Sequence, residues 1–107
     1  MNSSQYSNNM TTFGRLPKNI NREENKYYIL YTYYATDIIK IENDNIGRKV
    51  TLSTGGYYTK STRNHMINML AREGINIDIS FAGREYKIRY NNKVYRFDLN
   101  DKCEFYL

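Results

Sequence analysis

Residues 50–74 (VTLSTGGYYTKSTRNHMINMLAREG) constrain the fold more than any other stretch of this chain. The stretch opens with residues that favour a strand, such as Val50 and Thr51. Gly55 and Gly56 then end the strand, because glycine adopts a positive φ angle without steric cost. The residues that follow have the spacing of an amphipathic helix. A strand, a sharp break and a helix in so short a span predict a sheet with one helix packed on it.

The ends of this helix are marked by capping residues. Three hydroxyl side chains near its start can accept a backbone N–H from the first turn: Thr59, Ser61 and Thr62. Of the three, we expect Ser61 to be the cap. Gly74 stands where a left-handed C-terminal cap is expected.

One face of the helix is apolar. Its apolar residues recur at helical spacing: Met66, Ile67, Leu70 and Ala71. Polar residues occupy the opposite positions: Asn64, Asn68 and Arg72. The first set is predicted to pack on a sheet and the second to face water.

Strands are predicted on both sides of the helix. Residues 27–34 are nearly all aromatic or β-branched, which predicts a strand covered on both faces. Residues 37–41 form a second strand or a continuation of the first, residues 42–47 a turn, and residues 48–53 the returning strand. This part is therefore a β-hairpin or a three-strand unit.

After the helix, apolar and polar residues alternate in three short runs, at residues 75–81, 86–90 and 94–99. Short turns between them predict a three-stranded antiparallel meander. Residues 103–107 form either an edge strand or a tail. The predicted fold class is α+β, with the N-terminal strands, one helix and then the meander.

The first 26 residues differ from the rest. They are rich in Asn and Ser, and their apolar residues follow no period. We expect residues 1–26 to be a polar, flexible arm, or an arm that orders on a partner with Phe13 and Leu16 as anchors. Residues 27–107 then make up a single α+β domain.

Charge and cysteine content limit the classes of function. The formal net charge is +5, with a sequence pI near 9.3, which favours anionic partners such as nucleic acid but is also common among small proteins. Cys103 is the only cysteine, so neither an intramolecular disulfide nor a cysteine-based zinc site is expected. With no signal peptide or membrane-spanning run in view, we expect a reducing interior.

The sequence offers little for catalysis. His65 is the only histidine, and pairing with Cys103 would give a nucleophile and a base. Asp101 and Glu104 flank Cys103 and oppose formation of a thiolate. We therefore expect a protein that is not an enzyme and that uses neither a metal nor a cofactor.

The start of the helix is the candidate partner-binding site. Lys60, Arg63 and His65 lie near its first turn, where unpaired backbone N–H groups already attract anions. Positive charge there costs the helix roughly 0.3–1 kcal/mol per residue, which suggests a negative partner. Tyr57 and Tyr58 precede these residues. Exposed tyrosines, of which Tyr33 is a further candidate, can stack on bases or anchor a protein interface, although most tyrosines are core residues.

A second basic patch is predicted on the meander. Its residues are Lys87, Arg89, Lys93 and Arg96. The alternative is that these charges keep the sheet edges from pairing with other chains.

The motif around the helix resembles that of a family of short, uncharacterised bacteriophage proteins. The resemblance rests on Leu52-Ser53, Gly55-Gly56-Tyr57, Thr59, Ser61-Thr62-Arg63-Asn64, Met66 and Asn68. The family pattern is Ser-x-Gly-Gly-Trp, a Thr-rich helix start and a basic-x-x-Met-Asn helix, and the match covers about residues 31–98. Tyr57 and Tyr86 depart from it, since tryptophan is usual at the first position and common at the second.

The resemblance implies a phage accessory protein that acts in the cytoplasm of a bacterial host. Such proteins include inhibitors of host defence, among them anti-CRISPR proteins. The expected function is a non-enzymatic inhibitor that binds a defence protein or nucleoprotein, foremost a CRISPR effector. The alternative is a small basic protein that binds phage nucleic acid. No membrane partner is expected, and dimer formation stays open.

Overall fold

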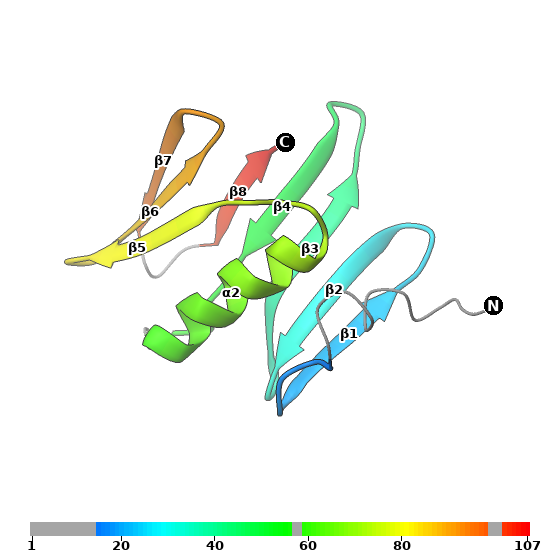
Figure 1. Ribbon diagram of the computed structural model, residues 1–107. Helices are drawn as coiled ribbons and strands as arrows, with labels where there is room; N and C mark the ends of the chain where they lie inside the picture. The colour runs from blue at the N-terminus through cyan, green and yellow to red at the C-terminus, as the bar shows by residue number, and fades with distance from the viewer. Residues whose placement is uncertain (1–14, 57–58, 99–101) are drawn as a thin grey trace.

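The chain folds into two antiparallel sheets and one helix. This is a computed structural model, and it describes residues 15–56, 59–98 and 102–107. A five-stranded sheet contains β1, β2, β3, β4 and β8, and a three-stranded meander contains β5, β6 and β7 (Figure 1). The elements are β1 (Ile20–Glu24), β2 (Tyr28–Tyr33), β3 (Thr36–Asn43), β4 (Arg48–Leu52), α2 (Lys60–Arg72), β5 (Asp78–Ala82), β6 (Glu85–Tyr90), β7 (Lys93–Asp98) and β8 (Cys103–Tyr106).

The α+β class, the helix and the three-stranded meander are confirmed. The predicted N-terminal hairpin or three-strand unit is too small, because β1 and β8 extend it to a five-stranded sheet. Strands β1 to β4 lie in chain order in the larger sheet, and β8 returns to pair with β4. Residues 103–106 therefore form an edge strand and not a tail. In the meander, Asn91 and Asn92 both have positive φ, 51° and 63°, as expected for a two-residue turn between β6 and β7.

The core lies between one face of the larger sheet and the layer formed by α2 and the meander. The register places the following buried side chains on that face: Tyr31, Ile39, Ile41, Val50, Leu52, Cys103 and Phe105. Helix α2 lies across the same face (Figure 1). Its Met66 and Leu70 and the meander's Ile79 and Ile88 belong to the same apolar cluster. One core thus joins both sheets to the helix.

The N-cap of the helix lies two residues earlier than expected. Thr59 is the N-cap, and its Oγ1 accepts a hydrogen bond from the backbone N–H of Thr62 at 3.1 Å. The prediction of Ser61 is wrong, because Ser61 is already helical and its hydroxyl lies 3.0 Å from that of Tyr33. Gly74 follows the helix with φ of 79°, which confirms the left-handed end.

The buried face of α2 is broader than predicted. Met66 and Leu70 are fully buried, Ile67 is partly buried, and Asn68 is exposed, all as expected. Arg72, expected in water, is 7% exposed, and Met69 is 2% exposed. On this side of the helix, Tyr33 of β2 contacts Ser61 and His65, and Arg22 of β1 bonds to Glu73.

Strand β1 lies in a segment that was predicted to be an arm. Ile20 pairs with Tyr33 of β2 and is buried, so Ile20–Glu24 belongs to the sheet rather than to a flexible arm. Leu16 also packs against the core. Strand β1 has one apolar residue, Ile20, so its own sequence does not predict a strand. Contacts with residues far along the chain hold it in the sheet. The rest of the predicted arm, residues 1–14, and with it Phe13, lies outside the described residues.

Candidate partner-binding surface

Tyr33, at the end of β2, connects the larger sheet to the start of α2. Its hydroxyl lies 3.0 Å from the Oγ of Ser61, and its ring centroid lies 4.5 Å from that of His65 in an edge-on arrangement. Ser61 and His65 are four positions apart and therefore share one side of the helix. Tyr33 thus fixes the side of the helix start that faces the β2–β3 turn.

Tyr34 stands next to it in an uncommon backbone conformation. It has φ of 54°, and its side chain is 66% exposed. Tyr33 pairs with Thr36, so Tyr34 and Ala35 form a two-residue turn in which only the first residue has positive φ. Glycine is the usual residue at that position of a hairpin turn. The ring of Tyr34 packs against that of Tyr33, with 4.7 Å between the centroids. The backbone N–H of Tyr34 donates to the carbonyl oxygen of Asn19.

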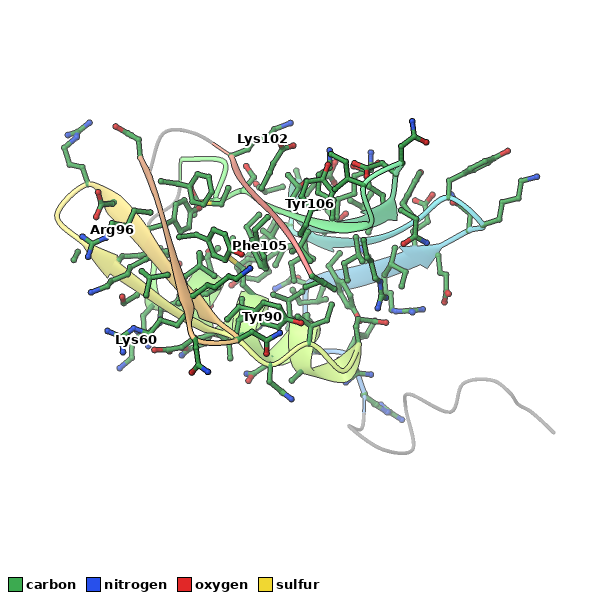
Figure 2. The ribbon with its side chains drawn as sticks, turned by 90° about the horizontal axis from the view of Figure 1, so that it is seen from above. Lys60, Tyr90, Arg96, Lys102, Phe105 and Tyr106 are labelled. Atoms are coloured by element: carbon green, nitrogen blue, oxygen red, sulfur yellow. The ribbon has the colours of Figure 1, made fainter. Side chains whose placement is uncertain are left out.

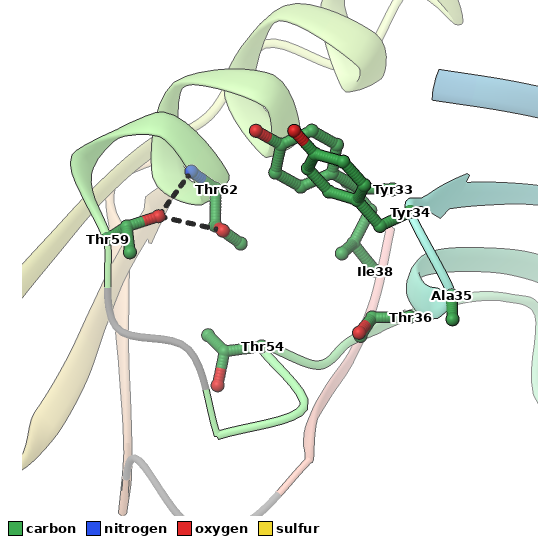
Figure 3. A pocket seen from close by; sticks show the side chains of 8 residues that line it. All are labelled: Tyr33, Tyr34, Ala35, Thr36, Ile38, Thr54, Thr59 and Thr62. Atoms are coloured by element: carbon green, nitrogen blue, oxygen red, sulfur yellow. Dashed lines mark hydrogen bonds between the residues drawn. The ribbon is translucent and has the colours of Figure 1, made fainter. Parts of the chain in front are cut away.

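A pocket of about 350 Å³ opens between this turn and the helix start (Figure 3). Its lining is apolar or carries hydroxyl groups: Tyr33, Tyr34, Ala35, Thr36, Ile38, Thr54, Thr59 and Thr62. The hydroxyls of Thr59 and Thr62 lie 3.0 Å apart on one wall. Such a lining suits an apolar or aromatic side chain that also carries a polar group.

Gly55 brings the β4–α2 connection close to this pocket. It has φ of 63°, and a Cβ placed there would lie 2.7 Å from Cγ2 of Thr36. The position therefore needs glycine both for its backbone conformation and for the close approach to β3. The Gly-Gly break of the sequence thereby positions one side of the pocket.

We call Tyr33, Tyr34, Lys60, Ser61 and His65 the helix-start surface. Lys60 is exposed at the first helical position. Burial lowers the pKa of the His65 imidazole below its usual value of 6.5, so His65 is neutral at pH 7. The surface is therefore aromatic, with one lysine as its positive charge.

The predicted site residues do not all meet on this surface. Arg63 and His65 are two positions apart and point to opposite sides of the helix. Arg63 donates from Nη2 to Oδ1 of Asn64 at 3.2 Å, and its Nε is buried with no hydrogen-bond partner among the residues that the structure describes. Tyr57 and Tyr58 lie outside the described residues. Sequence reasoning missed Tyr34, whose only signal was its place beside the break between two strand-like runs.

The predicted basic patch on the meander is divided between the two faces. Lys87, Arg89 and Arg96 share the outer face, whereas Lys93 pairs with Tyr90 and lies on the other. On the outer face, Asp78 neighbours Arg89, and Glu85 and Asp98 lie opposite each other. Glu85 also pairs with Arg96 at 3.6 Å. Three cations and three carboxylates share this face, so it does not form a surface of one sign.

A buried ionic group joins β1 and β2 to the end of α2. Arg22 Nε donates to Oε2 of Glu73 at 2.9 Å, and the hydroxyl of Tyr31 donates to the same oxygen at 2.5 Å. Burial and the hydrogen bond to Glu73 raise the pKa of the Tyr31 hydroxyl. Glu73 holds the pKa of Arg22 above its usual value despite burial. Arg22 and Tyr31 both bond to Glu73, and the Arg22 guanidinium also lies over the Tyr31 ring. These mutual contacts indicate a structural role.

In the described part of the chain, no group of three or more His, Cys, Asp or Glu side chains is placed to hold a metal ion. Cys103 is fully buried on β8. Helix α2, the one helix in the described ranges, is not long and apolar enough to cross a membrane.

Comparisons with protein-family models, curated proteins and solved structures find no match to this chain. The helix-start surface is therefore interpreted from its own residues.

Proposed function

We propose that the protein is a non-enzymatic inhibitor that binds a bacterial defence protein or nucleoprotein, with CRISPR effectors as the foremost target class. It would act in the cytoplasm of a bacterium infected by a phage. The resemblance of residues 52–68 to short phage proteins supports the choice of target class. The helix-start surface supports binding by protein contact.

Tyr34 is the observation that carries the proposal. A left-handed backbone costs a non-glycine residue roughly 1–2 kcal/mol, and Tyr34 is two-thirds exposed, so burial does not repay that cost. A strained and exposed aromatic residue beside an open pocket suggests selection for binding. Tyrosines at the centre of interfaces are frequent sources of binding energy. Lys60, exposed at the first position of the helix, would speed the encounter with an acidic partner.

The test is inhibition of DNA cleavage by a panel of purified CRISPR effectors, each loaded with guide RNA. We expect the protein to inhibit at least one effector. Tyr34→Ala combined with Lys60→Glu should weaken that inhibition by about 30-fold, as expected for loss of about 2 kcal/mol. The matched control is Lys87→Glu combined with Arg89→Glu on the outer face of the meander, which should change inhibition little. Absence of inhibition across the panel, or a larger loss in the control, would contradict the proposal.

Nucleic-acid binding is the second candidate, and the net charge of +5 favours it. The two candidates differ in their response to salt. Binding to DNA or RNA would weaken steeply between about 50 and 200 mM salt, because counterions released from phosphates drive it. Binding to a protein through Tyr34 would weaken much less. Fluorescence anisotropy with labelled single-stranded and double-stranded DNA over this range separates them.

A further inference from the structure

The two sheets end side by side at strands β7 and β8. Strand β7 is the last strand of the meander, and β8 is the last strand of the larger sheet. The two are close in the chain, yet the structure records no pairing between them. Figure 2 shows them from above, with Phe105 and Tyr90 between them. We call the space between β7 and β8 the seam.

The seam contains a cavity of about 410 Å³. From the meander it is lined by Tyr90, Lys93 and Tyr95, and from β8 by Glu104, Phe105 and Tyr106. The rings of Tyr95 and Phe105 stack with 5.4 Å between centroids, and Tyr90 lies 6.1 Å from Phe105. Consecutive residues of β8, whose side chains alternate between the two faces of the sheet, line the cavity, so the cavity reaches the outer edge of that strand.

Among the residues that the structure describes, no strand pairs with the outer edge of β8. Leu107 N–H donates to the carbonyl oxygen of Arg48 at 2.9 Å, in register with the β4–β8 ladder. In an antiparallel pair, alternate residues turn their N–H and C=O groups to the same side. Phe105 therefore bonds toward β4 as Leu107 does. Glu104 and Tyr106 turn their backbone groups toward the seam.

The chain protects its other sheet edge but not this one. In β1, at the far side of the larger sheet, three of five residues are charged (Arg22, Glu23 and Glu24), and Pro17 precedes the strand. Charged side chains and proline are common means of keeping an edge from pairing. Strand β8 has only Glu104, and that carboxylate lies 3.8 Å from Lys49 on β4. Within the described ranges of the chain, β4 is the one strand that pairs with β8, so the edge at the seam can accept a further strand.

Charge at the two ends of the seam indicates the partner's chemistry. Lys93 begins β7, and Lys102, labelled in Figure 2, immediately precedes β8. Because the end of β7 is close in the chain to the start of β8, the two lysines lie at opposite ends of the seam. Both are exposed, and neither has a carboxylate partner within the described residues. An extended segment with an acidic residue at each end and an apolar residue between would match them.

We propose that the seam binds such a segment of a partner protein as an added β-strand. The segment exchanges backbone hydrogen bonds with Glu104 and Tyr106, as in strand addition to other open sheet edges. Its residue opposite Phe105 points into the cavity between Tyr90 and Tyr95. The acidic residues lie near Lys93 and Lys102. The inference does not rest on the proposed function, since the helix-start surface has no part in it.

The probe is the peptide acetyl-Glu-Val-Thr-Val-Thr-Glu-amide, titrated into the ¹⁵N-labelled full chain and followed by NMR. Six extended residues span about 20 Å, enough to cover the four residues of β8. We expect the amide signals of Glu104 and Tyr106 to shift most and to gain contacts with the peptide backbone. The same peptide with lysine in place of glutamate should bind at least about fivefold more weakly.

The decisive variant is Glu104→Pro, matched by Glu104→Ala. Proline removes the N–H that faces the seam, and β4 does not use that N–H. Glu104→Pro should weaken peptide binding at least about fivefold. Glu104→Ala keeps the N–H and should bind the peptide as well as the unchanged chain or better. Circular dichroism should show that both variants keep the fold.

Three results would overturn the proposal. The first is the absence of shifts at Glu104 and Tyr106 up to about 5 mM peptide, a concentration that detects even weak binding. The second is equal binding by the two Glu104 variants. The third is a dimer in sedimentation that Glu104→Pro abolishes, because a second copy of the chain would then occupy the seam. Inhibition of a CRISPR effector is measured separately, so either proposal can fail alone.

Discussion

At Tyr34 the needs of folding and of binding oppose each other. The turn needs a residue that tolerates positive φ, which asparagine and glycine do best. The chain has instead a large aromatic ring that is mostly in solvent. The local cost of this choice falls on the free protein, where the contact with Tyr33 offsets part of it. Under the proposed function, the main benefit comes with a partner.

Tyr34→Asn should therefore change stability and binding in opposite directions. We expect the free energy of unfolding to rise by about 1 kcal/mol, because the backbone strain is relieved. Inhibition or partner binding should fall at the same time. Urea denaturation measures the first and the cleavage assay the second. A loss of stability above about 1 kcal/mol would mean that the Tyr33–Tyr34 contact outweighs the strain.

His65 should make stability depend on pH near neutrality. Its pKa in the folded chain is below the usual 6.5, so the unfolded chain takes up the proton first as pH falls. The unfolded state then binds more protons, and stability increases with pH up to about 6.5. Urea denaturation at about pH 5 and pH 7.5 should show this difference reduced in His65→Gln. An unchanged difference would show that His65 is equally solvated in both states.

The ion pair between Arg22 and Glu73 joins strand β1 to the end of helix α2. Glu73 stands at the C-terminal end of α2, where a negative charge is unfavourable to the helix dipole. The contacts with Arg22 and Tyr31 explain its presence, since 7% of the Glu73 side chain is exposed and 19% of the Arg22 side chain. This group is what ties the first strand of the sheet to the helix.

Glu73→Ala should lower the free energy of unfolding by about 3 kcal/mol, because it removes the buried partner of Arg22 and leaves only the more exposed Glu24 to pair with it. The control is Arg22→Met combined with Glu73→Leu, which removes both charges and should cost much less. Denaturant unfolding of the unchanged chain, Arg22→Met, Glu73→Leu and the double variant gives the coupling energy of the pair. If Glu73→Ala costs less than about 0.5 kcal/mol, β1 is held by Ile20 and its backbone bonds alone.

Local patterns were sufficient to predict the helix and the meander. The spacing of Met66 and Leu70 and the left-handed Gly74 are local features, and they determine where α2 packs and ends. Strand β1 could not be predicted in this way. Ile20–Glu24 has one apolar residue, and what fixes it is contact with residues far along the chain, such as Arg22 with Glu73, 51 positions apart.

The same limit applies to the site. The helix start was identified from its charges and tyrosines, but which side of the helix meets β2 depends on tertiary packing. His65 lies against Tyr33, whereas Arg63 points the other way, and the sequence alone did not distinguish them. Tyr34 was missed because a positive φ at a tyrosine leaves no pattern in the sequence.

The return of β8 to β4 determines the order in which the molecule can assemble. Asp44 and Tyr106, joined by a hydrogen bond of 2.5 Å, are 62 positions apart in the chain. Closing so long a loop is slow, and proteins rich in such contacts fold in milliseconds to seconds. Until β8 arrives, the edge of β4 beside Val50 and Leu52 has no neighbour. Stopped-flow refolding should therefore show a late step that Phe105→Ala slows, and aggregation should compete with folding during that interval.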